Sequence, residues 1–276
     1  PRQIGGLAFT ADGRRLIVQE HIGEVVVYDL ETRQPVPGLV QPSMGVRMGY
    51  SPTNDLVAFP WNVVNRSGAE DWEVRVWDLR RNTIVSRLRN EGGYTTSLAF
   101  SPDGRWLAGF GPAGGSVWDL ATGNLITNLF SRGGPLTDQS GVVVFSPAGD
   151  QLAVGDYDGS VRLHALPSGD LEADLPFVDN GVFGLAFAPN GRWLVASSSL
   201  SSNVWARVWE LPSRRAMELP GLRHPPGGLA FDPSGALLAA GDGHLIRIWD
   251  LAQRRLLASL PGHRSLVSRL AFAPNG

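Results

Sequence analysis

Short apolar runs separated by turn residues recur along the whole chain, and residues 98–111, LAFSPDGRWLAGFG, show the unit most clearly. Leu98 and Phe100 precede the turn and Leu107 follows it, with the partial alternation that favours β-strands. In the Ser-Pro-Asp-Gly turn at 101–104, proline holds the φ angle needed at the first central position of a type I turn, and glycine tolerates a positive φ. The stretch predicts two antiparallel strands joined by a short turn.

The same unit returns every 41 to 50 residues. An aromatic residue precedes the turn in each copy: Phe9, Tyr50, Phe100, Phe145, Phe187, Phe231 and Phe272. A second motif, an apolar strand that in most copies ends in an aromatic and an acidic residue, keeps the same spacing at 25–30, 74–79, 115–120, 161–166, 206–211 and 246–251. A period of this length with four strand-length pieces is typical of a propeller blade.

With this period and its Trp-Asp signature, the chain resembles the WD-repeat β-propeller family over essentially all of its 276 residues. The resemblance implies an all-β fold, a β-propeller of four-stranded antiparallel blades, with six complete blades and the inner strand of a seventh. We expect a single WD-repeat domain over residues 1–276. Its blades are expected at 4–41, 44–90, 94–131, 139–176, 181–220 and 226–261, with a partial blade at 265–276.

The last repeat stops within its turn, and the chain has no spare outer strand with which to close a ring. We therefore expect an incomplete domain, a fragment of a longer chain with a seven-bladed ring. A six-bladed ring with one surplus strand is the alternative.

Each predicted blade is apolar on both faces, so a blade can bury its surface only against its neighbours. The expected blade residues are the Trp-Asp positions Trp77, Asp78, Trp118, Asp119, Trp209, Trp249 and Asp250. One buried tryptophan removes roughly 150–250 Å² from water, which corresponds to roughly 4–6 kcal/mol as an upper bound. Loss of one of these tryptophans is expected to loosen two blades.

The charge pattern changes this picture little. The net charge is −2, and all 24 basic residues are arginine, scattered at blade intervals without forming a stripe. The sequence therefore predicts no nucleic-acid partner. The absence of lysine fits GC-rich coding, from which we expect a bacterial source.

Other compositional features exclude classes of chemistry. The chain has no cysteine, which excludes disulfides, thiol catalysis and thiolate metal sites. No 18-residue apolar run is present, so we expect no contact with a membrane. No signal peptide is visible, which leaves the compartment unknown and favours the cytoplasm.

Motifs that carry chemistry are weak in this sequence. GDYDGS at 155–160 offers two carboxylates but lacks the further oxygen ligands of a calcium loop. No nucleophile-elbow, phosphate-loop or dinucleotide fingerprint follows a strand and opens a helix. We expect no catalytic residue, no metal and no cofactor.

One hydrogen-bonded set is implied by the resemblance. Family members often join a histidine before the first strand, an aspartate between the second and third strands, and the tryptophan of the third strand. His224, Asp242 and Trp249 approximate this set. The expected role is structural, since these residues tie loops together.

Two loops between the second and third strands are longer than the others, at 60–72 and 197–205. In a propeller, both leave the face that also carries the connections between blades, where insertions often mark partner binding. The expected partner-binding residues are Trp61, Asn65, Arg66, Trp72, Tyr157, Asn203 and Trp205. The alternative is that the tryptophans fold back on the blade edges as caps.

These observations predict a non-catalytic scaffold for protein–protein interaction. It would bind a protein or peptide partner through its loop face, as part of a larger regulatory or signalling polypeptide. The alternative is a propeller-type enzyme, or the substrate-gating propeller of a hydrolase, with a site at the central channel. Arg47, Asp138 and Arg269 leave room for that alternative, although the other inner-strand positions are small or neutral.

Overall fold

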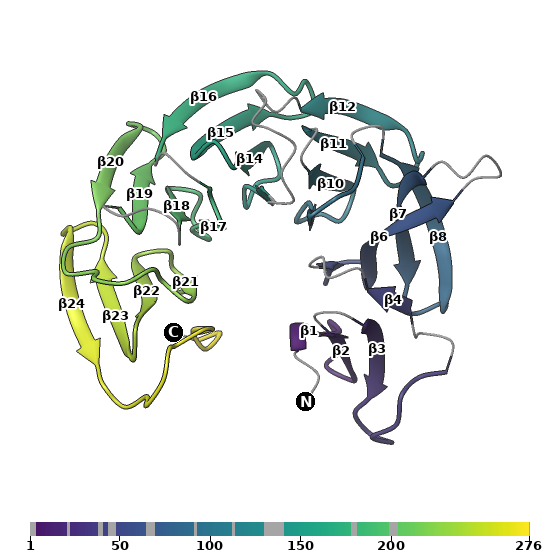
Figure 1. The fold of residues 1–276 in the computed structure, drawn as a ribbon, viewed down its shortest axis with the longest axis horizontal. Helices are drawn as coiled ribbons and strands as arrows, with labels where there is room; N and C mark the ends of the chain where they lie inside the picture. The colour runs from purple at the N-terminus through teal and green to yellow at the C-terminus, as the bar shows by residue number, and fades with distance from the viewer. Residues whose placement is uncertain are drawn as a thin grey trace. The chain divides into compact units, whose positions relative to one another are not determined.

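A computed structural model describes residues 4–20, 23–37, 41–43, 48–64, 70–90, 93–111, 114–129, 141–177, 181–198 and 204–275. Within these residues the chain forms 24 strands in six four-stranded antiparallel sheets, and no helix (Figure 1). This confirms the predicted all-β class with four-stranded antiparallel blades. In every sheet the four strands are consecutive in sequence and neighbours in space.

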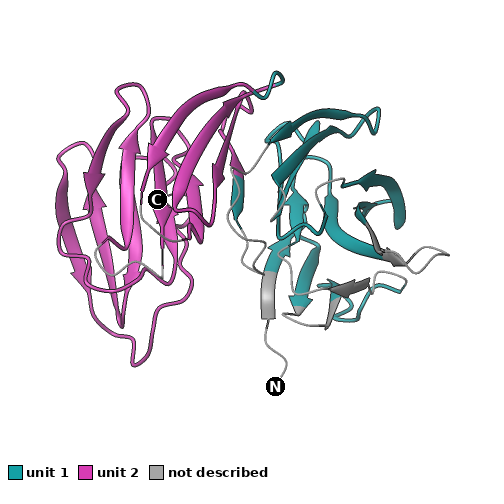
Figure 2. Ribbon diagram, turned by 45° about the horizontal axis from the view of Figure 1, so that its top comes forward, with its two compact units in different colours: residues 1–143, 167–169 teal, residues 144–166, 170–276 magenta. Residues whose placement is uncertain are grey.

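The chain divides into two compact units, residues 1–143 with 167–169 and residues 144–166 with 170–276 (Figure 2). The expectation of one domain over 1–276 stays a prediction.

The first unit holds three sheets. Sheet 1 contains β1 (Ile4–Phe9), β2 (Arg15–Glu20), β3 (Gly23–Asp29) and β4 (Gln41–Ser43). Sheet 2 contains β5 (Gly49–Ser51), β6 (Leu56–Val64), β7 (Glu70–Asp78) and β8 (Thr83–Arg89). Sheet 3 contains β9 (Ser97–Phe100), β10 (Trp106–Gly111), β11 (Gly114–Asp119) and β12 (Leu125–Leu129).

The second unit holds the other three sheets, apart from the first residues of β13. Sheet 4 contains β13 (Val142–Phe145), β14 (Gln151–Gly155), β15 (Ser160–Ala165) and β16 (Leu171–Pro176). Sheet 5 contains β17 (Gly184–Phe187), β18 (Trp193–Ser197), β19 (Ala206–Glu210) and β20 (Arg215–Glu218). Sheet 6 contains β21 (Leu229–Phe231), β22 (Leu237–Asp242), β23 (Leu245–Asp250) and β24 (Arg255–Leu260).

Sheet 2 buries both of its faces inside the first unit. Val57, Phe59 and Trp77 pack with buried residues of sheet 1, such as Ile17, whereas Ala58 on the opposite face packs with sheet 3. Successive residues of a strand point to opposite faces, so this alternation along β6 serves two interfaces at once. The packing explains why each repeat needs a neighbour.

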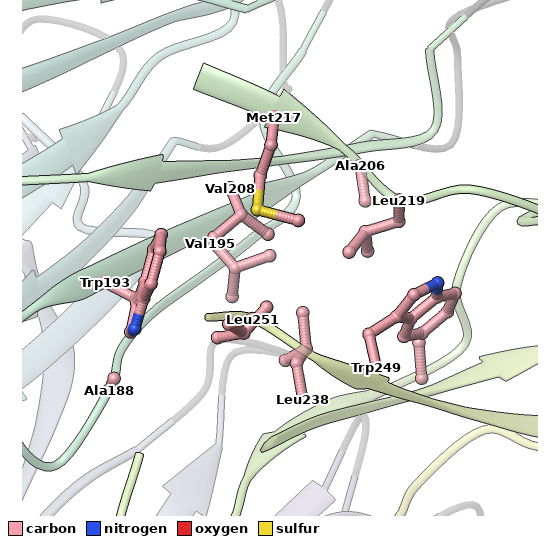
Figure 3. Packing of buried hydrophobic residues seen from close by; sticks show 11 residues of the cluster. Ala188, Trp193, Val195, Ala206, Val208, Met217, Leu219, Leu238, Trp249 and Leu251 are labelled. Atoms are coloured by element: carbon pink, nitrogen blue, oxygen red, sulfur yellow. The ribbon is translucent and has the colours of Figure 1, made fainter. Parts of the chain in front are cut away.

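The second unit repeats this arrangement between sheets 5 and 6. Trp193 and Val195 of β18 and Leu238 of β22 lie in one buried cluster with Trp249 of β23 (Figure 3). The indole Nε1 of Trp249 donates a hydrogen bond to the carbonyl of Pro220 at 2.9 Å, so the buried ring keeps its polar atom satisfied. The Trp-Asp tryptophans are all buried, namely Trp77, Trp118, Trp209 and Trp249.

The aspartate of the Trp-Asp signature holds the turn after the third strand. Asp119 Oδ1 accepts hydrogen bonds from the backbone N–H groups of Ala121 and Thr122 at 3.0 and 3.1 Å. Asp78 and Asp250 bind the N–H groups of their own following turns in the same way. Such side chain–backbone hydrogen bonds stabilise turns. This local role accounts for the aspartate of the Trp-Asp signature.

The turn between the first and second strands has the predicted chemistry. The N–H of Gly104 donates to the carbonyl of Ser101 at 2.9 Å, and Gly104 has a φ of 71°. Asp103 Oδ1 accepts from Ser101 Oγ at 2.6 Å and from the N–H of Arg105 at 3.0 Å. A Cβ at Gly104 would also lie 2.2 Å from the Asn54 amide nitrogen in the neighbouring sheet. Glycine is therefore favoured both by the positive φ and by the lack of space for a side chain.

The segment after β24 differs from the predicted inner strand of a seventh blade. Residues 261–275 contain no strand, although Val267 is buried against sheet 6 and its N–H donates to the carbonyl of Gly243 at 2.9 Å. A Cβ at Gly241 would lie 3.0 Å from the Val267 Cβ, so the glycine allows this close approach. A strand requires a ladder partner, and no described strand pairs with this segment.

Candidate partner-binding site

The longest hairpin among the described residues joins β6 to β7, each nine residues long. The ladder runs from Leu56 opposite Asp78 to Val64 opposite Glu70. β8 pairs with β7 only as far as Glu73, so the hairpin continues beyond β8 for three residue pairs. The predicted loop at 60–72 was therefore wrong in extent, since 60–64 and 70–72 are strand residues.

Trp61 lies at the base of this extension, where neighbouring side chains hold its ring in place. The guanidinium carbon of Arg75 lies 3.9 Å from the Trp61 ring centroid, a cation–π contact. Arg75 Nε forms an ion pair with Glu73 Oε1 at 2.5 Å, and Glu73 is the ladder partner of Trp61. The half-buried indole also packs against the buried cluster shared by sheets 1 and 2. Trp61 therefore packs as a cap on the cluster between sheets 1 and 2, with Arg75 stacked on its ring.

Trp72 lies on the opposite face of the hairpin. Its ring centroid is 5.7 Å from that of Tyr94, with a tilt of 54°. Asn62, the ladder partner of Trp72, has a side-chain oxygen that is buried without a hydrogen-bond partner among the described residues. Trp72 is half-buried.

The other predicted partner-binding residues divide into two groups. Tyr157 lies in the β14–β15 turn, and Trp205 lies just before β19; both are half-buried. The Trp205 carbonyl accepts a hydrogen bond from the N–H of Ser198 at 2.9 Å, which closes the β18–β19 connection. Asn65, Arg66 and Asn203 lie outside the described residues.

His224, Asp242 and Trp249 are brought together, although not as the resemblance implied. His224 Nδ1 lies 2.9 Å from Asp242 Oδ1. The same oxygen accepts from the N–H groups of Arg223 and His224 at 3.0 and 2.8 Å. Trp249 reaches this loop through Pro220 and does not bind the histidine.

Asp242 owes its ionised state to this network. Burial alone raises the pKa of Asp242, but the hydrogen bonds from the Arg247 guanidinium, the His224 ring and the Arg223 backbone outweigh burial and lower the pKa below its usual value. The carboxylate is 1% exposed, and its charge is neutralised within the fold. The Asp242 carboxylate therefore positions the turn and is not itself open to solvent, whereas the His224 ring is exposed.

Sequence reasoning missed three arginines: Arg75, which stacks on Trp61, and Arg162 and Arg247, which pair with the aspartates of their turns. Each stands two residues before the aromatic or histidine position of its third strand, so its side chain shares a face with that residue. The repeated arginine in VRVW, VRLH and IRIW was the available signal.

No group of three or more histidine, aspartate or glutamate side chains in the part of the chain that the structure describes is arranged to hold a metal ion. That same part contains no helix that is long and apolar enough to span a membrane. What the arrangement offers is contact chemistry: tryptophan faces, a stacked guanidinium and ordered turns.

Comparison with known proteins agrees with this geometry. A family model described as "WD domain, G-beta repeat" matches residues 83–122, 129–164, 175–205 and 223–250. The chain is 25% identical over 161 residues to a striatin homolog of Dictyostelium discoideum, covering 57% of the chain and 20% of the relative. It is 24% identical over 277 residues to the periodic tryptophan protein 2 homolog of the same organism, covering 98% of the chain and 29% of the relative. It is also 24% identical over 211 residues to the nuclear distribution protein nudF of Aspergillus niger, covering 75% of the chain and 41% of the relative.

The chain thus spans between about a fifth and two-fifths of the length of these relatives. All three come from eukaryotes, so the expected bacterial source finds no support in them.

Proposed function

The chain belongs to the WD40 repeat family, and from this premise we propose that it is a non-catalytic scaffold that binds a protein or peptide partner. Binding takes place at the end of the sheets where the second strand passes to the third, and the β6–β7 hairpin is its main contact. The repeat architecture supplies a rigid frame, and function in such frames is concentrated in the connections.

The extension of the β6–β7 hairpin carries this proposal. Its three residue pairs lie beyond the β7–β8 ladder, where the chain just after β8 contacts Trp72 through the Asn90 N–H, which donates to the Trp72 carbonyl at 3.0 Å. Trp72 is held by Tyr94 and Trp61 by Arg75, so neither ring has to be ordered when a partner binds. Rigid tryptophan side chains are frequent binding hot spots.

A peptide-selection experiment tests the hairpin. A phage-displayed library of random 12-residue peptides is selected on the intact chain, and the dissociation constants of selected peptides are then measured on variants. Trp72→Ala is expected to weaken binding by about thirtyfold, the loss typical of a hot-spot aromatic residue. Trp106→Ala is the matched control, because Trp106 is also half-buried but lies at the opposite end of sheet 3, opposite Asp119.

Trp61→Ala distinguishes binding from capping. Because Trp61 packs against the buried cluster, its loss is expected to lower the melting temperature as well as the affinity. Trp72→Ala is expected to lower mainly the affinity. If peptides selected on the chain bind Trp72→Ala and Trp106→Ala as well as they bind the wild type, the hairpin is a cap and this proposal fails.

Two finer hypotheses remain proposals. One is that the scaffold serves a larger regulatory or signalling polypeptide, and the relatives are in fact longer than the region they share with this chain. The other is the alternative of an enzyme or gating propeller. Two of the three channel residues considered for it, Arg47 and Asp138, lie outside the described residues, and Arg269 is exposed.

A further inference from the structure

Positive charge is concentrated in the last quarter of a chain whose net charge is negative. Residues 211–276 hold eight arginines, four carboxylates and three histidines, whereas the whole chain has a net charge of −2. This asymmetry becomes a surface feature only if the cations share one end of sheet 6. The contacts of the β22–β23 turn show that several of them do.

Two segments converge on the β22–β23 turn. Arg223 and His224 are tied to it by their backbone N–H groups, which donate to Asp242. The His224 ring lies over the turn, because a Cβ at Gly243 would be 3.3 Å from His224 Nδ1. From the other side, the Val267 N–H donates to the Gly243 carbonyl at 2.9 Å.

The C-terminal segment contributes further cations. Arg269 lies beside the start of β21, because a Cβ at Gly228 would be 3.2 Å from the Arg269 Cα. In Figure 1 the yellow segment after β24 turns back toward β21 and β22. Arg264 stands three residues before the anchored Val267. We call the exposed basic side chains of this turn and of the two segments that meet it the basic patch: Arg223, His224, His244, Arg264 and Arg269.

No described carboxylate at this turn balances the patch from outside. Asp242 is 1% exposed and is already bound to Arg247, so its charge is used within the fold. Asp232 and Asp250 lie at the opposite end of sheet 6, where Leu237 pairs with Asp250 and donates through its N–H to Asp232. Glu218 belongs to β20 and faces Arg207 at 3.8 Å.

An apolar side chain lies within the patch. Leu266 is 76% exposed, more than any other large apolar side chain among the described residues. It stands between Arg264 and Arg269 and is adjacent to the buried Val267, which anchors the segment. A leucine exposed among cations offers both an electrostatic and an apolar contact.

We propose that the basic patch and Leu266 dock an acidic protein segment, rich in aspartate and glutamate, that carries one apolar side chain. This inference rests on the proposed function and names the chemistry of one partner. Unbalanced arginines favour and steer an anionic partner, and the leucine adds an apolar contact. A single-stranded nucleic acid fits less well, because its bases bind aromatic platforms and the patch contains neither tryptophan nor tyrosine.

The probe is a synthetic, dye-labelled 12-residue peptide of alternating glutamate and aspartate with one central leucine. Fluorescence anisotropy measures its binding to the intact chain at about 50 mM and about 150 mM salt, since surface electrostatics weaken with ionic strength. Arg223→Ser combined with Arg264→Ser is expected to weaken binding at least about tenfold. The matched control is Arg214→Ser combined with Arg215→Ser, two exposed arginines at the far end of sheet 5, where less than a twofold change is expected.

Leu266→Ser separates the two contacts. It is expected to weaken binding of the leucine-containing peptide and to leave binding of a peptide with alanine in place of the leucine unchanged. All substituted side chains are exposed, and circular dichroism on heating checks that each variant keeps the wild-type fold.

Three results would overturn the proposal: no peptide binding to the wild type at 50 mM salt, equal losses in the patch and control variants, or tighter binding of a 12-residue oligothymidine than of the acidic peptide. Failure of the proposed function is recognised separately. In that case Trp72→Ala leaves the phage-selected peptides bound, whatever the acidic peptide does.

Discussion

Two turns of the second unit use the same buried ion pair and present opposite charges to solvent. The β14–β15 turn pairs Asp156 with Arg162 at 3.2 Å. The β22–β23 turn pairs Asp242 with Arg247. In both, a Gly-Asp pair lies at the end of the second strand (β14 ends at Gly155, just before Asp156, and β22 ends at Asp242). The arginine stands in the third strand, two residues before its aromatic or histidine position.

The partners added around each pair differ. Arg162 is shared with a second carboxylate, Asp158 at 2.5 Å, and Asp158 stands at the surface. Asp242 instead bonds to the His224 ring and accepts from the backbone N–H groups of Arg223 and His224, and the Arg223 side chain is exposed. One turn therefore has a surplus of acid and the other a surplus of base. The common pair shapes the turn, and the neighbouring residues decide what charge a partner meets.

The largest expected effect separates the two aspartates. Asp242→Ala leaves the buried Arg247 without its carboxylate and two N–H groups without their acceptor, so we expect the free energy of unfolding to fall by about 3–5 kcal/mol. Asp156→Ala leaves Arg162 bound to Asp158, so we expect the free energy of unfolding to fall by only about 1–3 kcal/mol. Urea unfolding monitored by tryptophan fluorescence measures both. Equal losses would show that the second carboxylate does not compensate.

A smaller effect concerns acid stability. In the folded chain, burial raises the pKa of Asp242, but its hydrogen bonds lower it more, so the pKa lies below the ordinary value of 3.8. A carboxyl group with a lowered folded-state pKa contributes stability above its unfolded pKa, and this stability is lost as pH falls through the folded pKa. We therefore expect the wild type to lose stability below about pH 3.8 more steeply than Asp242→Asn.

Asp158→Asn is the comparison for that measurement. The Asp158 pKa is also lowered, because the hydrogen bonds from Ser160 and Arg162 outweigh partial burial. Asp158 is more exposed than Asp242, and solvent screening is expected to make its contribution to the acid slope smaller. Urea midpoints at pH 7, 5, 4 and 3 give the two slopes, and a steeper loss in Asp242→Asn than in the wild type would contradict the expectation.

The smallest expected effect is that of the histidine. His224 is 58% exposed, and its ring adds one of several bonds to Asp242. His224→Gln keeps a hydrogen-bonding side chain, so we expect a loss of about 0.5 kcal/mol. A thermal melt measures it against Ser160→Ala, which removes an exposed hydroxyl bond to Asp158 in the other turn. A loss as large as that of Asp242→Ala would mean that the histidine, and not the arginine, holds the turn.

The repeated strands could be predicted because their causes are local. The Ser-Pro-Asp-Gly turn, the alternation of Leu98 and Phe100, and the Asp119 turn contacts all involve residues within a few positions of one another. The hairpin extent at 60–72 was mispredicted, because polar and small residues there read as a loop. The ladder that carries β6 to Val64 is visible only when β7 is placed beside it.

By itself, then, the sequence determined the six four-stranded sheets and their strand order, the turn chemistry and the burial of the Trp-Asp tryptophans, because each follows from neighbouring residues. Only the tertiary structure decided that Arg75 covers Trp61, that Asp242 joins Arg247 to His224, and that Val267 bonds to the β22–β23 turn. The Asp242–His224 contact spans 18 residues of sequence, and the Val267–Gly243 contact spans 24. Contacts of this kind form only after sheets have packed, because packing brings together side chains that the periodicity of one strand cannot relate.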